Sequence, residues 1–519
     1  MSEGSTLDST PRIARLSSHR YYPLLLSGLS GMLLVLSFPR FSIFPLAWVA
    51  LVPWLVVLPR LSFKRALLSS VTFGFVFFAG LLYWIALFGY LPWVLLALVQ
   101  GLFVTAAGIC IWLYRRLSTT GRMISSAATW TVFEWLRGFG PYGFTWGWLG
   151  YSQSPWIDLI QIVCITGVPG LSFLILLHNA AVAGFFVPSS GGMRRRLTPL
   201  ISVWVIILAL TLFGRFGPIN PKWSKTALKV AILQPSPREP REEDVGRFWT
   251  EEEVALQQEN LEGLTREAAA LHPELIIWPE SALPAVLNTS EPLKTWAAEI
   301  ARKGEAGLLL GAAHEDEAEN THNSAYLLSP EGEFLDRYDK VQLVPFGEFV
   351  PGRNWLPGLQ YYPIRGYDLT PGEGFHKLRL YPWLDLGVSI CFESIFPHIF
   401  RHSLPDLWVI ITNDGWFKRT AAPAQHRQAA VFRAVETRRW VLRAASTGIS
   451  CVISPRGEIT KELELYQRGV LEEEVKVQED VTLYHRFGDW FVVLAAALTL
   501  GCLAQTLRKA QSSRKTESV

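Results

Sequence analysis

Long apolar runs fill the first part of the chain, and one more follows near its end. A helix needs about 20 largely apolar residues to cross a bilayer, and Trp and Tyr crowd the edges of these runs, as they do at membrane interfaces. The pattern predicts a polytopic α-helical membrane domain of about eight spans. The expected spans are Tyr22–Ser37, Phe44–Leu58, Leu67–Phe88, Pro92–Tyr114, Met123–Leu136, Ile160–Val187, Leu200–Gly214 and Trp490–Leu507.

From Thr226 the pattern changes to short β-rich runs separated by amphipathic helices. Such alternation predicts an α/β layered domain. We expect strands at Leu228–Gln234, Leu275–Trp278, Gly307–Gly311, Ser324–Leu328, Leu386–Ile390, Leu407–Thr412, Val441–Ala445 and Val452–Ser454. We expect helices at Glu251–Leu271, Pro292–Lys303, Ser394–His402 and Pro423–Glu436.

Charge divides the chain at the same place. Residues 1–225 carry 17 basic and 4 acidic side chains, whereas residues 226–487 carry 27 basic and 39 acidic ones. This division excludes a single soluble globule, a disordered chain and a nucleic-acid binder. Five cysteines in 519 residues do not make a disulfide framework.

The basic residues also predict an orientation. Arg and Lys clusters precede the first span and follow each even-numbered span, so the positive-inside rule puts both termini in the cytoplasm. We therefore expect residues 226–487 on the outer face. The predicted organisation is a cytoplasmic tail (1–20), a membrane domain (21–225), the α/β domain (226–487), an eighth span (488–507) and a second cytoplasmic tail (508–519).

Three expected strands end at a polar residue, where open α/β sheets place their sites. Glu280 follows Leu275–Trp278, and a partly desolvated carboxylate there suits a general base, although a plain helix N-terminal acid fits about as well. Lys340 opens an apolar run and suits an oxyanion-stabilising cation, although a lone Lys is more often a surface residue. Glu348 follows in a Pro/Gly-rich loop and is placed to orient Lys340.

Cys391 lies at a sharp turn between an expected strand and the expected helix from Ser394. Rigid backbone would aim its thiol, and a nearby helix N-terminus would favour the thiolate. The other four cysteines fit better as small buried residues. A nucleophile, a base and a cation at three strand ends point to nucleophilic catalysis.

These segments resemble the nitrilase (carbon–nitrogen hydrolase) superfamily, with its Glu-Lys-Cys triad on an α-β-β-α sandwich. Together with the spans, nearly the whole chain resembles the bacterial apolipoprotein N-acyltransferase family. The supporting segments are Phe133–Gly138, Trp148–Gln153, Val344–Glu348, Thr412–Phe417, Gln425–His426 and Arg443–Gly448.

The resemblance implies roles for individual residues. Glu280 would be the base, Lys340 the oxyanion cation and Cys391 the nucleophile, with Glu348 and Glu393 as supporting acids. The chain departs from the family where Phe392 replaces a frequent Tyr, where Lys418 replaces a frequent Gly, and where Trp249 stands in for a Trp nearer the first strand. The candidates for substrate contact are Trp249, Trp278 and Trp416, and aromatic residues of 355–362 with Trp416 form either a lid or a hydrophobic loop contact.

The resemblance further implies acyl transfer at the bacterial inner membrane. The donor would be a phospholipid, with phosphatidylethanolamine implied, and the acceptor the N-terminal diacylglyceryl-cysteine of an apolipoprotein. We expect a monomer with no metal and no cofactor, since the histidines lack ligand spacing and no phosphate loop occurs. Two alternatives stay open: a membrane-tethered amidase or nitrilase, and a transporter whose outer domain binds substrate.

Overall fold

The computed structural model describes residues 21–140, 142–186, 192–217, 223–236, 250–353 and 368–517. The chain divides into two compact units, each assembled from separated segments. Unit 1 comprises Met1–Arg137, Pro169–Ala209 and Phe491–Val519, and unit 2 comprises Gly138–Val168 and Leu210–Trp490.

Unit 1 is helical. Its α-helices are α2 (Tyr22–Leu36), α3 (Val52–Val57), α4 (Phe63–Leu81), α5 (Tyr90–Leu113), α6 (Thr119–Leu136), α9 (Val168–Phe185), α10 (Gly192–Phe216) and α15 (Trp490–Glu517). One end of α9, of α10 and of α15 belongs to the segments of unit 2. Short 3₁₀ turns lie between some of them: η1 (Phe44–Trp48), η2 (Leu58–Arg60), η3 (Tyr83–Phe88) and η4 (Tyr114–Arg116).

Small side chains let these helices pack closely. A Cβ atom added to Gly74 of α4 would lie 2.8 Å from the carbonyl oxygen of Gly101 in α5, so the two backbones touch. Ser27 of α2 and Ser69 of α4 share a buried hydrogen bond of 2.6 Å. Close backbone approach and interhelical hydroxyl bonds are typical of helices that associate in lipid.

Five described helices are long and apolar enough to cross a membrane, which is fewer than the predicted eight: α4, Tyr90–Arg116, α9, α10 and Trp490–Lys509. The shortfall has local causes. Helix α2 has only 15 residues, and the expected span at Phe44–Leu58 is split between η1 and α3. The third missing span, Met123–Leu136, lies in α6, whose 18 residues include Arg122 and Glu134 and which is not among the five. The expected span Ile160–Val187 is shortened to α9, because Gly167, whose left-handed φ is 67°, separates it from the apolar stretch Ile157–Thr166.

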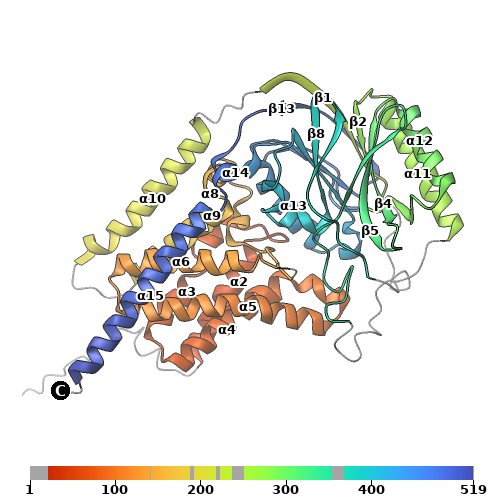
Figure 1. The fold of residues 1–519 in the computed structure, drawn as a ribbon. Helices are drawn as coiled ribbons and strands as arrows, with labels where there is room; N and C mark the ends of the chain where they lie inside the picture. Colours follow the sequence, from red (N-terminus) through yellow and green to blue (C-terminus); the bar gives the residue numbers. More distant parts are fainter. Residues whose placement is uncertain are drawn as a thin grey trace, which may run out of the picture. The chain divides into compact units, whose positions relative to one another are not determined.

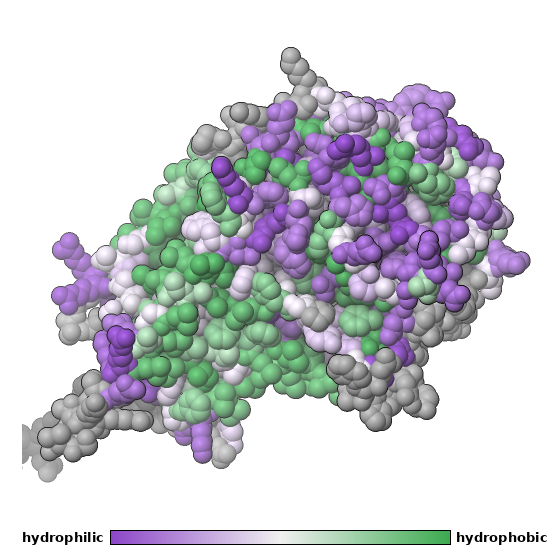
Figure 2. All heavy atoms as spheres, viewed as in Figure 1, coloured by the Kyte–Doolittle hydropathy of each residue, from purple (hydrophilic) through white to green (hydrophobic). Residues whose placement is uncertain are grey.

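The exposed surface of the unit 1 helices is apolar. Figure 2 shows hydrophobic side chains covering the visible faces of these helices, whereas hydrophilic ones cover the strand-containing unit. Leu102 in α5 is 60% exposed, and Val493 and Leu500 in α15 are 68% and 67% exposed. A continuous apolar surface of this kind marks contact with lipid or another apolar partner.

Unit 2 contains two β-sheets (Figure 1). The seven-stranded sheet has the order β13-β1-β2-β4-β5-β6, with β3 paired to β4; its strands are β1 (Trp223–Gln234), β2 (Leu275–Ile277), β3 (Leu283–Val286), β4 (Gly307–Glu315), β5 (Thr321–Leu328), β6 (Phe334–Asp339) and β13 (Gly469–Gln478). The six-stranded sheet has the order β12-β11-β10-β9-β8-β7; its strands are β7 (Lys377–Tyr381), β8 (Leu384–Ile390), β9 (Leu407–Thr412), β10 (Val441–Ala445), β11 (Cys451–Ile453) and β12 (Ile459–Glu462).

Alternating side chains of these strands build two hydrophobic cores. In β1, Val230 and Ile232 face the core shared with the other sheet, whereas Ala231 and Leu233 face α11 (Glu251–Ala269) and α12 (Glu291–Gly304). Helix α13 (Ala422–Thr437) packs against β10 and β11 on the outer face of the six-stranded sheet. The result is the predicted α-β-β-α sandwich.

The prediction that fails in unit 2 is the helix over Ser394–His402. The chain instead forms two 3₁₀ turns, η8 (Cys391–Ile395) and η9 (Ile399–Arg401). Pro397 lies between them, and proline disfavours helical backbone at the residue before it. The turn that carries Cys391 is therefore short and has no α-helix behind it.

Candidate active site

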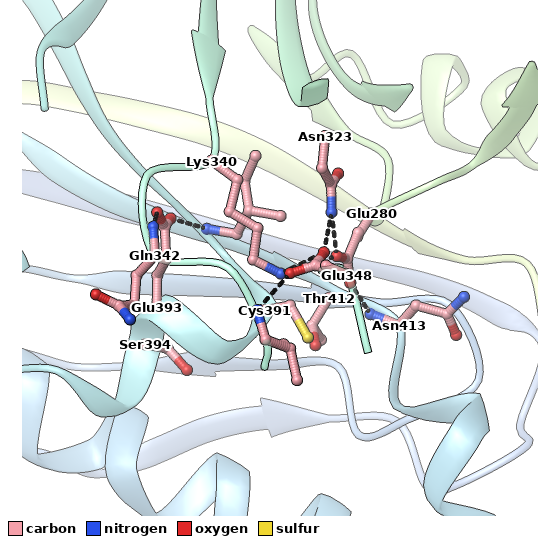
Figure 3. A network of polar contacts seen from close by, with 12 residues as sticks. Glu280, Asn323, Lys340, Gln342, Glu348, Cys391, Glu393, Ser394, Thr412 and Asn413 are labelled. Carbon is pink, nitrogen blue, oxygen red and sulfur yellow. Dashed lines mark hydrogen bonds and ion pairs between the residues drawn. The ribbon is translucent and has the colours of Figure 1, made fainter. Parts of the chain in front are cut away.

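Three strand ends deliver Glu280, Lys340 and Cys391 to one place. Lys340 directly follows β6, Cys391 directly follows β8, and Glu280 lies three residues beyond β2. The Lys340 Nζ lies 3.6 Å from Glu280 Oε1. Figure 3 shows the Cys391 thiol beside both side chains, so the sheets bring the predicted nucleophile, cation and base together.

Lys340 is buried between two carboxylates. Its side chain is 1% exposed, and its Nζ donates to Glu348 Oε1 at 2.9 Å. Burial alone would lower the pKa of Lys340, but Glu348 and Glu280 outweigh it and raise that pKa above the usual range. Lys340 is thus a fixed cation and not a proton donor at neutral pH.

Hydrogen bonds hold both oxygens of Glu280. Oε1 accepts from the Asn323 side chain at 2.7 Å, and Oε2 accepts from the Asn413 backbone N–H at 2.7 Å. Asn323 also donates to Glu348 Oε1 at 3.0 Å, so one amide sets the spacing of the two carboxylates. A carboxylate held from two sides would need little reorganisation before it accepts a proton.

Glu348 is anchored by its own loop. Its Oε2 accepts from the Val344 backbone N–H at 2.8 Å, while Oε1 contacts Lys340 and Asn323. Burial would raise the pKa of Glu348, but Lys340 lowers it and keeps the carboxylate ionised. Glu348 therefore orients Lys340, as its position in the sequence suggests.

Cys391 occupies a strained turn. Its φ of +54° is left-handed, a conformation that costs a residue with a side chain about 1–2 kcal/mol. Burial and the charge of Glu280 raise the pKa of its thiol well above the usual value, and Lys340 and a hydrogen bond to Thr412 lower it only in part. The prediction that a helix N-terminus favours the thiolate is therefore wrong, because the thiol is desolvated and no α-helix follows.

Glu393 accepts four hydrogen bonds around this turn. Its Oε1 accepts from the backbone N–H groups of Val341 at 2.7 Å and Gln342 at 3.1 Å and from the Tyr338 hydroxyl at 3.0 Å. Its Oε2 accepts from the Ile390 N–H at 2.8 Å. Burial raises the pKa of Glu393 to about 7 against these donors. Glu393 thus links the segment after Lys340 to η8 (Cys391–Ile395), the nucleophile turn.

Comparison with known proteins assigns this arrangement to a family. The family model described as carbon-nitrogen hydrolase matches residues 229–483, and that described as apolipoprotein N-acyltransferase N-terminal domain matches residues 30–181. A relative from Geobacter metallireducens, named apolipoprotein N-acyltransferase, is 36% identical over 91% of this chain and 94% of its own length. The chain belongs to the apolipoprotein N-acyltransferase family.

Further relatives agree with this assignment. Apolipoprotein N-acyltransferases of Rhodopseudomonas palustris and Thermotoga maritima are each 31% identical to this chain, over 91% and 92% of it and over 93% and 92% of their own lengths. Among solved structures, Nit3 of Saccharomyces cerevisiae, a member of the nitrilase superfamily, aligns with a TM-score of 0.39 at 17% identity, over 49% of this chain and 93% of that one.

Part of the region matched by the N-terminal family model contacts the nucleophile turn. Gly138–Val168 belongs to unit 2. Thr145 and Tyr151 donate from their hydroxyls to the carbonyl oxygen of Ile395, the last residue of η8, at 2.6 and 3.2 Å. Phe144 packs against Phe392 with 6.1 Å between ring centres. This segment therefore contributes directly to the surroundings of Cys391.

The remaining predicted residues differ in how close they lie to the triad. Phe392 is 8% exposed and packs against Phe144 and Phe396, so its ring fills space beside Cys391. Trp278 is wholly buried in the core under α11, where its Nε1 donates to Thr265, and the structure does not bring it to the triad. Trp416 is half-buried in η10 (Asp414–Phe417), just after Asn413. Trp249 and the aromatic residues of 355–362 lie outside the described residues.

Sequence reasoning missed Asn323 and the positioning roles of Thr412 and Asn413. Asn323 lies 43 residues from Glu280 and 25 from Glu348, and only the pairing of β4 with β5 brings it to them. Thr412 and Asn413 follow the same rule as the triad, since they stand at the end of β9. Within the described ranges, no group of three or more His, Cys, Asp or Glu side chains could hold a metal ion.

Proposed function

We propose that this chain is an apolipoprotein N-acyltransferase that moves an acyl chain from a phospholipid, through a thioester on Cys391, to the α-amine of an N-terminal diacylglyceryl-cysteine. The observation that carries the proposal is the half-buried Cys391 beside buried Lys340 and Glu280 in a chain of this family. The apolar helices of unit 1 suit an enzyme whose two substrates are both lipids.

The first step forms the thioester. Glu280 takes the thiol proton as Cys391 attacks the carbonyl carbon of an acyl ester, because the protonated thiol is a weak nucleophile without a base. Lys340 and the N–H of Phe392 stabilise the resulting oxyanion. As the intermediate collapses, the carbon–oxygen bond breaks and Glu280 returns the proton to the departing lysophospholipid oxygen.

The second step forms the amide. The neutral α-amine of the diacylglyceryl-cysteine attacks the thioester carbonyl, and Glu280 takes a proton from the attacking nitrogen. The carbon–sulfur bond breaks, and Glu280 returns the proton to the Cys391 sulfur, which restores the starting state. Glu348 and Glu393 act as supporting acids, and Phe392 lines the site as an apolar wall.

The cellular setting follows from the charge pattern. We infer an inner-membrane protein with both termini in the cytoplasm and residues 226–487 on the outer face. Phosphatidylethanolamine is the proposed donor, and a monomer is the proposed assembly. The sequence-predicted organisation of residues 21–225, 226–487 and 488–507 belongs to the same proposal.

The test uses the purified full chain in phospholipid-containing detergent without acceptor. Intact-protein mass spectrometry should find wild type carrying one acyl chain on Cys391 and Cys391→Ala carrying none. Adding a diacylglyceryl-cysteine peptide should remove the acyl group from Cys391 and yield the N-acylated peptide. The matched control is Cys451→Ala, because Cys451 is a buried strand residue in the same sheet.

Two outcomes would reject the proposal. Wild type that gains no acyl mass on Cys391 would exclude the thioester route. Hydrolysis of soluble amides without any need for phospholipid would instead favour a membrane-tethered amidase.

A further inference from the structure

A buried charged cluster lies directly behind the nucleophile turn and has no part in the proposed steps. Asp414, His426 and Arg443 are 0%, 1% and 0% exposed. Taking an ion pair out of water costs several kcal/mol for each charge unless close contacts offset that cost. A cluster kept at this depth next to Cys391 is a candidate for a functional role.

The cluster reaches the backbone of Cys391 through His426. Arg443 Nη2 lies 2.6 Å from Asp414 Oδ2 and 3.2 Å from His426 Nδ1, and Asp414 Oδ1 lies 3.0 Å from the same Nδ1. On the other side of the ring, Nε2 lies 3.0 Å from the Cys391 carbonyl oxygen and 2.7 Å from Ser394 Oγ. The imidazole thus bridges the ion pair and the nucleophile turn.

The neighbours of His426 assign its proton. A carbonyl oxygen only accepts, so Nε2 must be the nitrogen that donates to Cys391. Burial and the charge of Arg443 lower the pKa of His426, and a neutral ring has a single N–H. Nδ1 then accepts from Arg443 Nη2, which also donates to Asp414 Oδ2, so Nδ1 and the carboxylate share the Arg443 cation and their own 3.0 Å contact is not a hydrogen bond. Arg443 thus supports the tautomer whose Nε2–H binds the turn.

The peptide group between Cys391 and Phe392 connects the His426 contact to the side of the turn on which the thiol reacts. The bond after Cys391 is trans, so its C=O and the N–H of Phe392 point in opposite directions. Among the described residues, the Phe392 N–H has no hydrogen-bond acceptor. A carbonyl held by His426 leaves this N–H directed away from α13 and free for a ligand.

We propose that His426, held by Asp414 and Arg443, is a positioning residue that aims the Phe392 N–H at the oxyanion formed when Cys391 attacks. The inference rests on the proposed acyl transfer through Cys391. It also explains why a strained, left-handed Cys391 is tolerated, since the His426 bond holds the peptide in the required orientation. Losing one oxyanion donor typically costs about 10²–10³-fold in rate.

The test compares two reactions of the same thiol in the full-length protein. Acylation by phospholipid develops an oxyanion, whereas alkylation by iodoacetamide is a direct displacement that develops none. In His426→Leu we expect kcat for acylation to fall about 10²–10³-fold with little change in KM for phospholipid. We expect the alkylation rate of Cys391 to stay within about twofold of wild type, because the thiol itself is not moved.

Conservative variants keep the test decisive if the leucine variant does not fold. His426→Gln places an amide N–H where Nε2 stood and should recover most of the acylation rate, whereas His426→Asn is too short and should not. Gln428→Leu is the control, because this buried side chain on the same helix bonds to Ser154 and should leave both rates unchanged.

The outcomes separate the two proposals. A parallel fall of acylation and alkylation in the His426 variants would overturn the positioning role, since it would mean that the thiol is misplaced. Full acylation in His426→Leu or in His426→Asn would overturn it as well. Wild type that is never acylated would instead reject the proposed function.

Discussion

At the scale of single residues, the environment of Cys391 decides how the site can work. Burial and Glu280 keep the thiol protonated at neutral pH, while Lys340 partly opposes them. In the proposed mechanism the thiol must therefore lose its proton during attack, and a fixed carboxylate must be close enough to take it. Glu280, with both oxygens hydrogen-bonded, meets that requirement.

The raised thiol pKa leads to a pH prediction. An ordinary thiol has a pKa of about 8.5, so its alkylation rate is half-maximal near that pH. For Cys391 we expect no half-maximal point between pH 8 and 9. The measurement is the rate of iodoacetamide alkylation from pH 6 to 10, in a variant that retains Cys391 and has the other cysteines replaced: Cys110→Ala, Cys164→Ala, Cys451→Ala and Cys502→Ala.

Replacing the nearby cation sharpens this prediction. Lys340 lowers the pKa of the thiol, so Lys340→Met should raise that pKa further and slow alkylation at every pH. Lys377→Met is the control, because Lys377 pairs with Asp385 on β8 and has no part in the proposed chemistry. A plateau above pH 9 in the Cys391-only protein would contradict the raised pKa.

At the scale of elements, strand ends were predictable and the contacts that orient them were not. Glu280 and Cys391 each follow an apolar run that predicts a strand, whereas Lys340 opens an apolar run and follows β6, which is not among the expected strands. Glu280 and Lys340 follow strands of the seven-stranded sheet and Cys391 follows a strand of the six-stranded one, so the sequence does not indicate how the two sheets bring them together. Asn323 lies within β5 and gives no such signal, because its role depends on the register of β4 and β5. The expected helix after Cys391 fails for a local reason, the proline at position 397.

The contact of Gly138–Val168 with η8 also escaped prediction, and it supports a test. Thr145 and Tyr151 supply two of the three hydrogen bonds to the Ile395 carbonyl, and Arg433 supplies the third at 3.3 Å. A buried hydrogen bond contributes about 1 kcal/mol. In the isosteric double variant Thr145→Val, Tyr151→Phe, we expect a Tm lowered by a few degrees and a several-fold slower acylation of Cys391.

The matched control lies in the same segment. Ser154 accepts from Gln428 of α13 at 3.0 Å and is remote in sequence from η8, so Ser154→Ala should change Tm comparably per bond but leave acylation unchanged. Equal acylation rates in the control and the double variant would mean that the segment only stabilises the fold.

At the scale of the whole molecule, the distribution of charge and the number of long apolar helices predict different membrane topologies. The predicted seven crossings before residue 226 put Lys64, in the first turn of α4, on the opposite side of the membrane from residues 226–487. The four long apolar helices before that point, if they alone crossed, would put both on the same side. Among the spans expected between Lys64 and residue 226, only Met123–Leu136, in α6, lies outside these four helices, so the parity of the crossings rests on α6.

The clustered cations decide between these topologies. Arg60, Lys64 and Arg65 lie together at the start of α4, and cytoplasmic loops carry the excess of Lys and Arg. We therefore expect Lys64→Cys and Gln511→Cys, in a background without other cysteines, to react with a membrane-impermeant maleimide only after spheroplasts are lysed. Glu331→Cys, at an exposed turn between β5 and β6, should react in intact spheroplasts. Labelling of Lys64→Cys and Glu331→Cys on the same side would mean that α6 does not cross, and it would contradict the expected placement of residues 226–487 on the outer face.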